Sequence, residues 1–187
     1  MATIAILAVQ GAFAEQASAF RAAGAETFEI RQLSDLARPF DALVLPGGES
    51  TVQGKLLVDL GLFEPLRRRI AGGLPVFATC AGLILLAEKL EGDPTVWFGS
   101  LPVTVRRNAY GRQLGSIDCR GRVGPDEDVP MTFIRAPGIV SVGDGVEILS
   151  RADGQPTGVR FGRIPAFAWH PELTRDTRPI RRFLERL

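Results

Sequence analysis

The chain has few of the residues that build metal centres and disulfide frameworks. Its 187 residues include one histidine and two cysteines, Cys80 and Cys119. Two cysteines cannot form a disulfide framework, and with a single histidine they complete a zinc site only if carboxylates join them. We therefore expect a protein that holds no metal and works in a reducing, cytoplasmic compartment.

Long apolar runs and an excess of charge of one sign are also absent. No apolar run reaches the about 20 residues that span a bilayer, and the N-terminal segment 1–9 lacks the basic start of a signal peptide. Twenty-two basic and 21 acidic residues leave a formal net charge of +1, so there is no global basic field to hold nucleic acid. The sequence predicts neither a membrane nor a nucleic acid as a partner.

The composition is that of one globular domain, because 45% of the residues are hydrophobic and 23% are charged. Apolar, strand-length segments at 3–9, 42–45 and 74–79 alternate with helical patterns in the first half. The second half contains short strands separated by Gly/Pro turns. This order predicts an α/β fold with three layers, a mixed and mainly parallel central sheet, and a single domain over 1–187. It also predicts a helix over 81–90 and a loop over 121–130.

The sharpest chemical signal is the segment around Cys80. An apolar strand leads directly into Cys80, a helix follows, and small residues stand two before (Ala78) and two after (Gly82). This is the nucleophile-elbow pattern with cysteine in place of serine. The start of the helix would point its dipole and free N–H groups at the sulfur, which favours the thiolate. The alternative is a small, buried cysteine at the end of a core strand. Cys119 has no such context, and we expect it to be incidental.

The single histidine, His170, follows an apolar strand and precedes Pro171 and Glu172. If Cys80 is a nucleophile with a histidine base, no other histidine is available. In extended backbone, Glu172 projects from the same side as His170, where its carboxylate could orient the imidazole. The alternative is a surface histidine before a turn, with Glu172 as the first-turn acid of a helix.

Two glycines follow the predicted strand at 42–45. There, backbone N–H groups could face a ligand at the carboxyl edge of the sheet. The N–H of Gly48 and that of Ala81 could form an oxyanion hole, or the two glycines could be a plain turn before a helix. Arg107 and Arg135 each follow a strand and could hold a substrate carboxylate, although each could equally be a solvated loop charge.

Together these segments resemble the class I, triad-type glutamine amidotransferases, and in detail the family of glutaminase subunits of pyridoxal 5′-phosphate synthase. The segments that carry the resemblance are residues 7–12, 45–51 with 54–56, 79–82 with 85–87, 107–113, 133–137 and 170–174. They occur in the family's order over almost the whole chain. The segments that point specifically to the glutaminase subunits of pyridoxal 5′-phosphate synthase are 107–113 (RNAYGRQ) and 133–137 (FIRAP).

The resemblance implies a flavodoxin-like fold and a glutaminase that needs no cofactor. Cys80 would be the nucleophile, His170 the general base and then acid, and Glu172 the acid that orients it. The residues that would line the glutamine site are Gln10, Gly48, Glu49, Ser50, Arg107, Ile134 and Arg135. The ammonia made from L-glutamine would pass to a separate pyridoxal 5′-phosphate synthase subunit, which would also raise the glutaminase activity.

Three positions depart from the family's pattern. Ala78 stands where the family usually has glycine, and Gln16 and Ile180 stand where histidines are common.

Other functions also remain open. They are the glutaminase of another pathway, such as imidazole glycerol phosphate synthase, a cysteine hydrolase acting on another amide or ester, and a non-catalytic module that binds glutamine to regulate.

Overall fold

The computed structural model describes residues 1–109 and 117–187, and at Ile117 the backbone alone. The helices are α1 (Phe13–Ala22), α2 (Ser50–Asp59), α3 (Phe63–Ala71), α4 (Ala81–Leu86) and α5 (Arg178–Leu184), with the 3-10 turns η1 (Leu33–Ala37) and η2 (Pro171–Leu173). Residues Tyr110 to Gln113, which contribute to the family resemblance, lie outside the described residues.

A nine-stranded sheet forms the centre of the described structure, in the order β2-β1-β3-β4-β12-β11-β10-β7-β8. Its strands are β1 (Thr3–Leu7), β2 (Glu26–Ile30), β3 (Ala42–Leu45), β4 (Val76–Thr79), β7 (Ile117–Val123), β8 (Asp126–Phe133), β10 (Glu147–Ala152), β11 (Gln155–Phe161) and β12 (Ile164–Phe167). Pairing is parallel from β2 through β12 and antiparallel from β12 through β8. The sheet is therefore mixed, as predicted, and its parallel half comes mostly from the first half of the chain.

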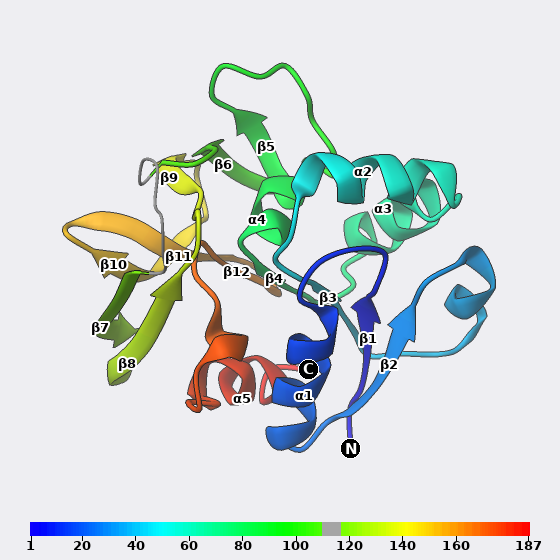
Figure 1. The fold of residues 1–187 in the computed structure, drawn as a ribbon, viewed down its shortest axis with the longest axis horizontal. Coiled ribbons are helices and arrows are strands. Elements are labelled where there is room, and N and C mark those ends of the chain that lie inside the picture. Colours follow the sequence, from blue (N-terminus) through cyan, green and yellow to red (C-terminus); the bar gives the residue numbers. More distant parts are fainter. Residues whose placement is uncertain (110–116) are drawn as a thin grey trace.

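Helices cover both faces of the parallel half. Figure 1 shows α1 and α5 on one side of the sheet and α2, α3 and α4 on the other. On the first side, the ring of Phe77 in β4 packs against Phe20 of α1 at 5.3 Å and against Phe183 of α5 at 5.4 Å between centroids. Because both faces are covered, every residue of β3, β4 and β12 is buried. The predicted three-layer α/β fold is confirmed.

The carboxyl ends of the parallel strands meet at one edge of the sheet. β1 ends at Leu7, β3 at Leu45, β4 at Thr79 and β12 at Phe167. The segments that follow these strands carry Gln10, the two glycines after Pro46, Cys80 and His170. Loops at this edge are where open α/β sheets bind their ligands.

The predicted helix over 81–90 is wrong in its second half. Helix α4 ends at Leu86, and the next four residues form the strand β5 (Ala87–Leu90). This strand pairs with β6 (Leu101–Arg106), which in turn pairs with β9 (Gly138–Val142) in a second sheet of three strands. The residues of β5 favour helix by intrinsic propensity, and their pairing with β6, a contact distant in sequence, overrides that preference.

The predicted loop over 121–130 is also wrong, because most of it belongs to the hairpin of β7 and β8. Val123 pairs with Asp126 across a two-residue turn in which Gly124 has a φ of +58°. The alternate residues Val129, Met131 and Phe133 are buried against the core. The polar residues between them obscured this period-two pattern in the sequence. The antiparallel half is larger than predicted for this reason.

Candidate active site

A cavity of about 500 Å³ opens at the carboxyl edge of the parallel strands. This volume is typical of sites for small molecules. Of the residues predicted to act or bind, the lining contains Gln10, Gly48, Glu49, Cys80, Arg107, Ile134, Arg135 and His170. The lining also contains Ala12, Gly47, Ile84, Asn108 and Leu173. The cavity therefore brings together residues from six separate parts of the chain.

Cys80 lies in a sharp turn between β4 and α4. Its φ of +48° and ψ of −102° are strained for a residue with a side chain. Its backbone N–H donates to the carbonyl of Phe167 at 2.8 Å, which ties the turn to β12. The predicted elbow is present, and the side chain of Cys80 reaches the cavity from the beginning of α4.

The small residue after the elbow is required by a close backbone approach. A Cβ on Gly82 would lie 2.2 Å from the carbonyl oxygen of Leu45, the last residue of β3. Such a contact could be relieved only by moving the backbone of a central strand. Ala78, the small residue before the elbow, is fully buried in β4, where it pairs with Leu45 on one side and Ala166 on the other.

His170 and Glu172 form a buried pair beside the cysteine. His170 Nδ1 and Glu172 Oε1 lie 2.8 Å apart, and the carboxylate side chain is completely inaccessible to solvent. The backbone N–H of His170 donates to the carbonyl of Thr132 in β8 at 2.9 Å. Because Glu172 occupies Nδ1, the Nε2 of the ring is left for Cys80.

The environment of His170 favours its protonated form. Burial opposes a charge on the imidazole, but hydrogen bonds to Cys80 and Glu172, and the negative charges of both, outweigh it. Together they raise the pKa of His170 from 6.5 to about 10. The raised pKa favours the imidazolium, which has a proton to give to a leaving group.

Gly47 lies against the histidine and the cysteine at the same time. A Cβ on Gly47 would be 2.3 Å from His170 Cε1 and 3.4 Å from Cys80 Cβ. The carbonyl of Gly47 accepts a hydrogen bond from the N–H of Ala12 at 2.9 Å. No side chain fits here, so the glycine is required by packing and the loop passes directly beside the reacting groups.

Two glutamines hold the loop that contains the glycines. Gln10 Oε1 accepts a hydrogen bond from the N–H of Glu49 at 2.9 Å. Gln53 Nε2 donates to the backbone carbonyls of Gln10 at 3.0 Å and Pro46 at 3.2 Å. Gln10 thus both lines the cavity and supports its wall. The role of Gln53 was not predicted from the sequence, because this residue lies within the helix α2 and belongs to no local motif.

Ser50 does not line the cavity. It is buried, and its hydroxyl accepts a hydrogen bond from Arg107 Nη1 at 2.8 Å. The same guanidinium nitrogen donates to Thr51 Oγ1 at 3.1 Å, and Nη2 lies 3.6 Å from Asp93 Oδ2. Ser50 therefore orients Arg107, which itself reaches the cavity.

Arg135 contributes a positive charge to the cavity from the segment that follows β8. Its backbone adopts a φ of +46°, which is uncommon for a side chain of this size. In the part of the chain that the structure describes, its guanidinium has no acidic partner. An exposed arginine of this kind at a cavity wall is suited to bind a carboxylate.

A family model of glutamine amidotransferases, named SNO, matches residues 6–187. The chain belongs to the SNO glutamine amidotransferase family. Two SNO relatives carry the name pyridoxal 5′-phosphate synthase subunit PdxT. That of Desulfitobacterium hafniense (strain Y51) is 53% identical, over 97% of this chain and 92% of its own length. That of Bifidobacterium longum is 51% identical, over 96% of this chain and 97% of its own.

Solved structures agree with the SNO assignment. A crystal structure described as a glutamine amidotransferase is 41% identical, covers 97% of each chain and has a TM-score of 0.91. A glutamine amidotransferase from Thermotoga maritima is 15% identical, covers 98% of this chain and 79% of its own, and has a TM-score of 0.64. The second likeness concerns the fold alone and confirms the predicted fold class of this SNO chain.

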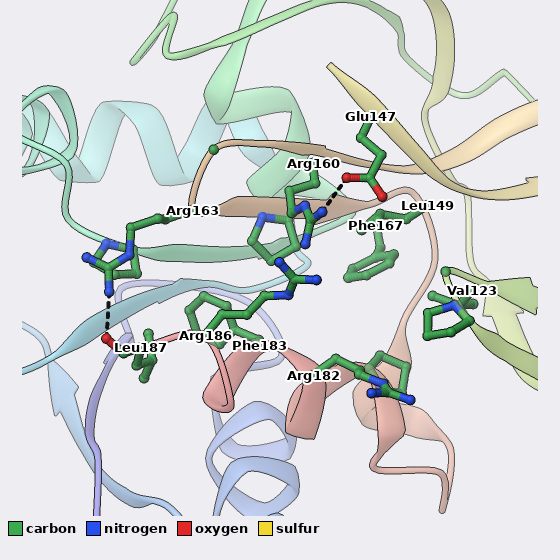
Figure 2. A pocket seen from close by; sticks show the side chains of 16 residues that line it. Val123, Glu147, Leu149, Arg160, Arg163, Phe167, Arg182, Phe183, Arg186 and Leu187 are labelled. Carbon is green, nitrogen blue, oxygen red and sulfur yellow. Dashed lines mark hydrogen bonds and ion pairs between the residues drawn. The ribbon is translucent and has the colours of Figure 1, made fainter. Parts of the chain in front are cut away.

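A second cavity of about 360 Å³ lies at the opposite, amino edge of the sheet. Figure 2 shows Arg160 and Arg186 directed into it above the ring of Phe183. Arg160 is paired with Glu147, and Arg163 Nη2 donates to the carbonyl of Leu187 at 2.8 Å. The lining of this cavity includes no cysteine and no histidine.

Within 1–109 and 117–187, no group of three or more histidine, cysteine, aspartate and glutamate side chains could hold a metal ion. None of the helices in these ranges is both long and apolar enough to cross a bilayer.

Proposed function

We propose that the chain hydrolyses L-glutamine to L-glutamate and ammonia through a γ-glutamyl thioester on Cys80. The observation that carries this proposal is that Cys80 and His170 line one cavity and are hydrogen-bonded to each other, while the buried Glu172 is bonded to Nδ1 of the imidazole. The triad geometry, with a raised pKa on the histidine, is suited to a thiolate–imidazolium pair.

The reaction proceeds in two steps. The Cys80 sulfur attacks the side-chain amide carbon of glutamine, the C–N bond breaks, and His170 gives its proton to the departing ammonia. A water molecule then attacks the thioester, and the neutral imidazole takes its proton. The C–S bond breaks, glutamate leaves, and the thiolate and imidazolium are restored.

The negative oxygen formed in each step needs donors beside Cys80. We assign them to the backbone N–H groups of Gly48 and Ala81. Ala81 is the first residue of α4, and the first N–H groups of a helix have no partner within it. Gly48 lines the same cavity, next to the glycine that packs against His170.

The rest of the cavity supplies complementary charges for glutamine. Arg107 and Arg135 suit its α-carboxylate, and the carboxylate of Glu49 suits its α-ammonium group. Ile134 offers an apolar contact at the cavity wall. Gln10 positions Glu49 by accepting a hydrogen bond from its backbone N–H.

The partner is a pyridoxal 5′-phosphate synthase subunit that receives the ammonia for vitamin B6 biosynthesis. Support comes from relatives about 50% identical over nearly the whole chain that carry the name of a subunit of this synthase. We further propose that residues 1–187 act as one glutaminase domain, since one hydrophobic core joins both halves. A cytoplasmic location is supported by two cysteines that are both unpaired.

Glutamate release by the purified chain, alone and with a pyridoxal 5′-phosphate synthase subunit, tests this function. We expect weak activity alone, a steep rise with the synthase, and no activity in either Cys80→Ala or His170→Asn. Substantial activity in either variant would refute the triad. Equal activity with and without the synthase would point to another pathway, such as imidazole glycerol phosphate synthesis. Glutamine binding without turnover would indicate a regulatory module.

A further inference from the structure

Both polar backbone atoms of Gly47 form hydrogen bonds that lead to α1. One bond is to the residue before this helix, and the other is to a side chain that the helix contacts. The carbonyl accepts from the N–H of Ala12, the residue before α1, at 2.9 Å. The N–H donates to Thr79 Oγ1 at 3.0 Å, and that hydroxyl also accepts from Gln16 Nε2 of α1 at 2.9 Å. The loop beside His170 is therefore held by two hydrogen bonds, one at the carbonyl and one at the N–H of Gly47.

The second of these attachments is fully removed from solvent. Gln16 and Thr79 each have a relative exposure of 0%. Gln16 lies on the face of α1 that otherwise buries Ala17 and Phe20, so it is a polar side chain among apolar ones in the core. Its Oε1 is buried with no partner among the described residues. A buried amide with an unpaired oxygen is costly, and such groups call for an explanation beyond packing.

We propose that Thr79 and Gln16 are positioning residues of the glutaminase site, which hold the peptide of Gly47 so that Gly48 presents its N–H to the oxyanion. Thr79 immediately precedes Cys80, so one residue joins the nucleophile's strand to the loop. Gln16 fixes the threonine hydroxyl. This inference rests on the proposed glutamine hydrolysis and adds to it the residues that set the geometry of its oxyanion hole.

The expected effects on kcat and KM follow from the stage of the reaction at which the oxyanion forms. Gly48 would meet full negative charge only in the transition state, whereas glutamine binds as a neutral amide at that position. A misplaced donor should therefore lower kcat and leave KM almost unchanged. A displacement of the order of 1 Å in such a group reduces the rate about 100-fold.

Thr79→Val tests the proposal, because it keeps the shape of the side chain and removes the hydroxyl. Glutamate release is measured with the synthase subunit present, over a range of glutamine concentrations. We expect kcat to fall about 10- to 100-fold, KM to stay within about twofold of the wild type, and Thr79→Ser to recover most of kcat.

The matched control is Thr157→Val in β11. Thr157 is equally buried, and its hydroxyl bonds to Ser150 Oγ at 2.9 Å, outside the cavity lining. We expect a similar loss of stability in this variant with kcat preserved. The proposal is overturned if Thr79→Val lowers kcat no more than Thr157→Val does, if the loss falls on KM, or if Thr79→Ser is as impaired as Thr79→Val.

Gln16→Met provides a second, milder variant in case Thr79→Val fails to fold. It preserves the length of the side chain and removes the donor to Thr79, which still accepts from Gly47. We expect a fall in kcat of several-fold with KM unchanged, and a kcat equal to that of the wild type would overturn the proposal. Cys80→Ala separates this result from the function itself. If Cys80→Ala retains activity, the proposed function fails, whereas its inactivity together with a normal Thr79→Val refutes only the positioning role.

Discussion

Gly47 touches the imidazole of His170 so closely that a methyl group on its Cα would sit 2.3 Å from Cε1. The contact joins the loop after β3 to His170, three residues beyond the end of β12. The proposed catalytic base and the wall of the proposed oxyanion site therefore constrain each other.

A substitution of Gly47 should therefore impair catalysis more than folding. In Gly47→Ala, the added methyl must push the imidazole from Cys80, and we expect kcat to fall about 100-fold. Glutamate release with the synthase present measures this effect. As a control, Gly73→Ala places a side chain at a φ of +93° with nothing within 4 Å, so it should lower stability and leave kcat intact. Activity of Gly47→Ala equal to that of Gly73→Ala would contradict the contact.

The parts of the site that could be predicted from the sequence are those with a strong local pattern. Cys80 follows an apolar strand between small residues, and His170 is the one histidine of the chain. Gln16 and Thr79 could not be predicted to meet, because their contact spans 63 residues and depends on how α1 lies on β4. Local patterns carry no information on such pairs.

The same limit explains the errors in the fold. Residues 87–90 have a helical composition, and they form a strand because β6, which begins at Leu101, pairs with them. In the hairpin at 121–130, glycine, proline and charged residues obscure the alternation of buried and exposed side chains along the strand. In both segments, a tertiary partner overrides local propensity.

The histidine itself offers a direct test, since a single histidine gives a single Cε1–H resonance. We expect this resonance to titrate at about pH 10 in the folded protein rather than at the ordinary 6.5. In Cys80→Ala and in Glu172→Gln, the titration should move to lower pH, because each removes a hydrogen bond and a negative charge that favour the imidazolium. A titration near 6.5 in the unmodified protein would exclude the resting ion pair.

The raised pKa of His170 also makes folding stability depend on pH. Because the folded-state pKa lies above the ordinary value, the bound proton stabilises the folded protein below pH 6.5. That stabilisation is lost as the pH rises from 6.5 to about 10. The free energy of unfolding in urea should therefore decrease across this range, and the decrease should be smaller in Glu172→Gln. An equal slope in both proteins would argue against the histidine as its source.

Arg135 should act on binding rather than on chemistry. Its guanidinium reaches the cavity without an acidic partner in the described residues, so Arg135→Ala should remove a charge-assisted contact to the α-carboxylate of glutamine. Such contacts contribute about 1.5–3 kcal/mol, which corresponds to a rise in KM of about 10- to 100-fold with kcat little changed. Arg186→Ala, at the other cavity (Figure 2), removes an arginine that is also exposed and should leave KM unchanged. A fall in kcat at constant KM in Arg135→Ala would assign this arginine to the reacting end of the substrate.

The close approach of Gly82 to β3 should make this position intolerant of any side chain. In Gly82→Ala, the new Cβ would lie 2.2 Å from the carbonyl oxygen of Leu45, and the contact can relax only by separating α4 from the central sheet. Overpacking in a rigid core costs about 1–3 kcal/mol, and we expect a loss toward the upper end because the opposing atom is backbone. Urea unfolding measures the loss, and glutamate release by the folded fraction should fall as well, since α4 begins beside Cys80. Gly92→Ala is the control for adding a methyl group, because its Cβ would meet nothing within 4 Å, although its φ of +74° has a cost of its own. If Gly82→Ala were as stable as Gly92→Ala and fully active, the small residue after the elbow would not be required by the approach of the two backbones.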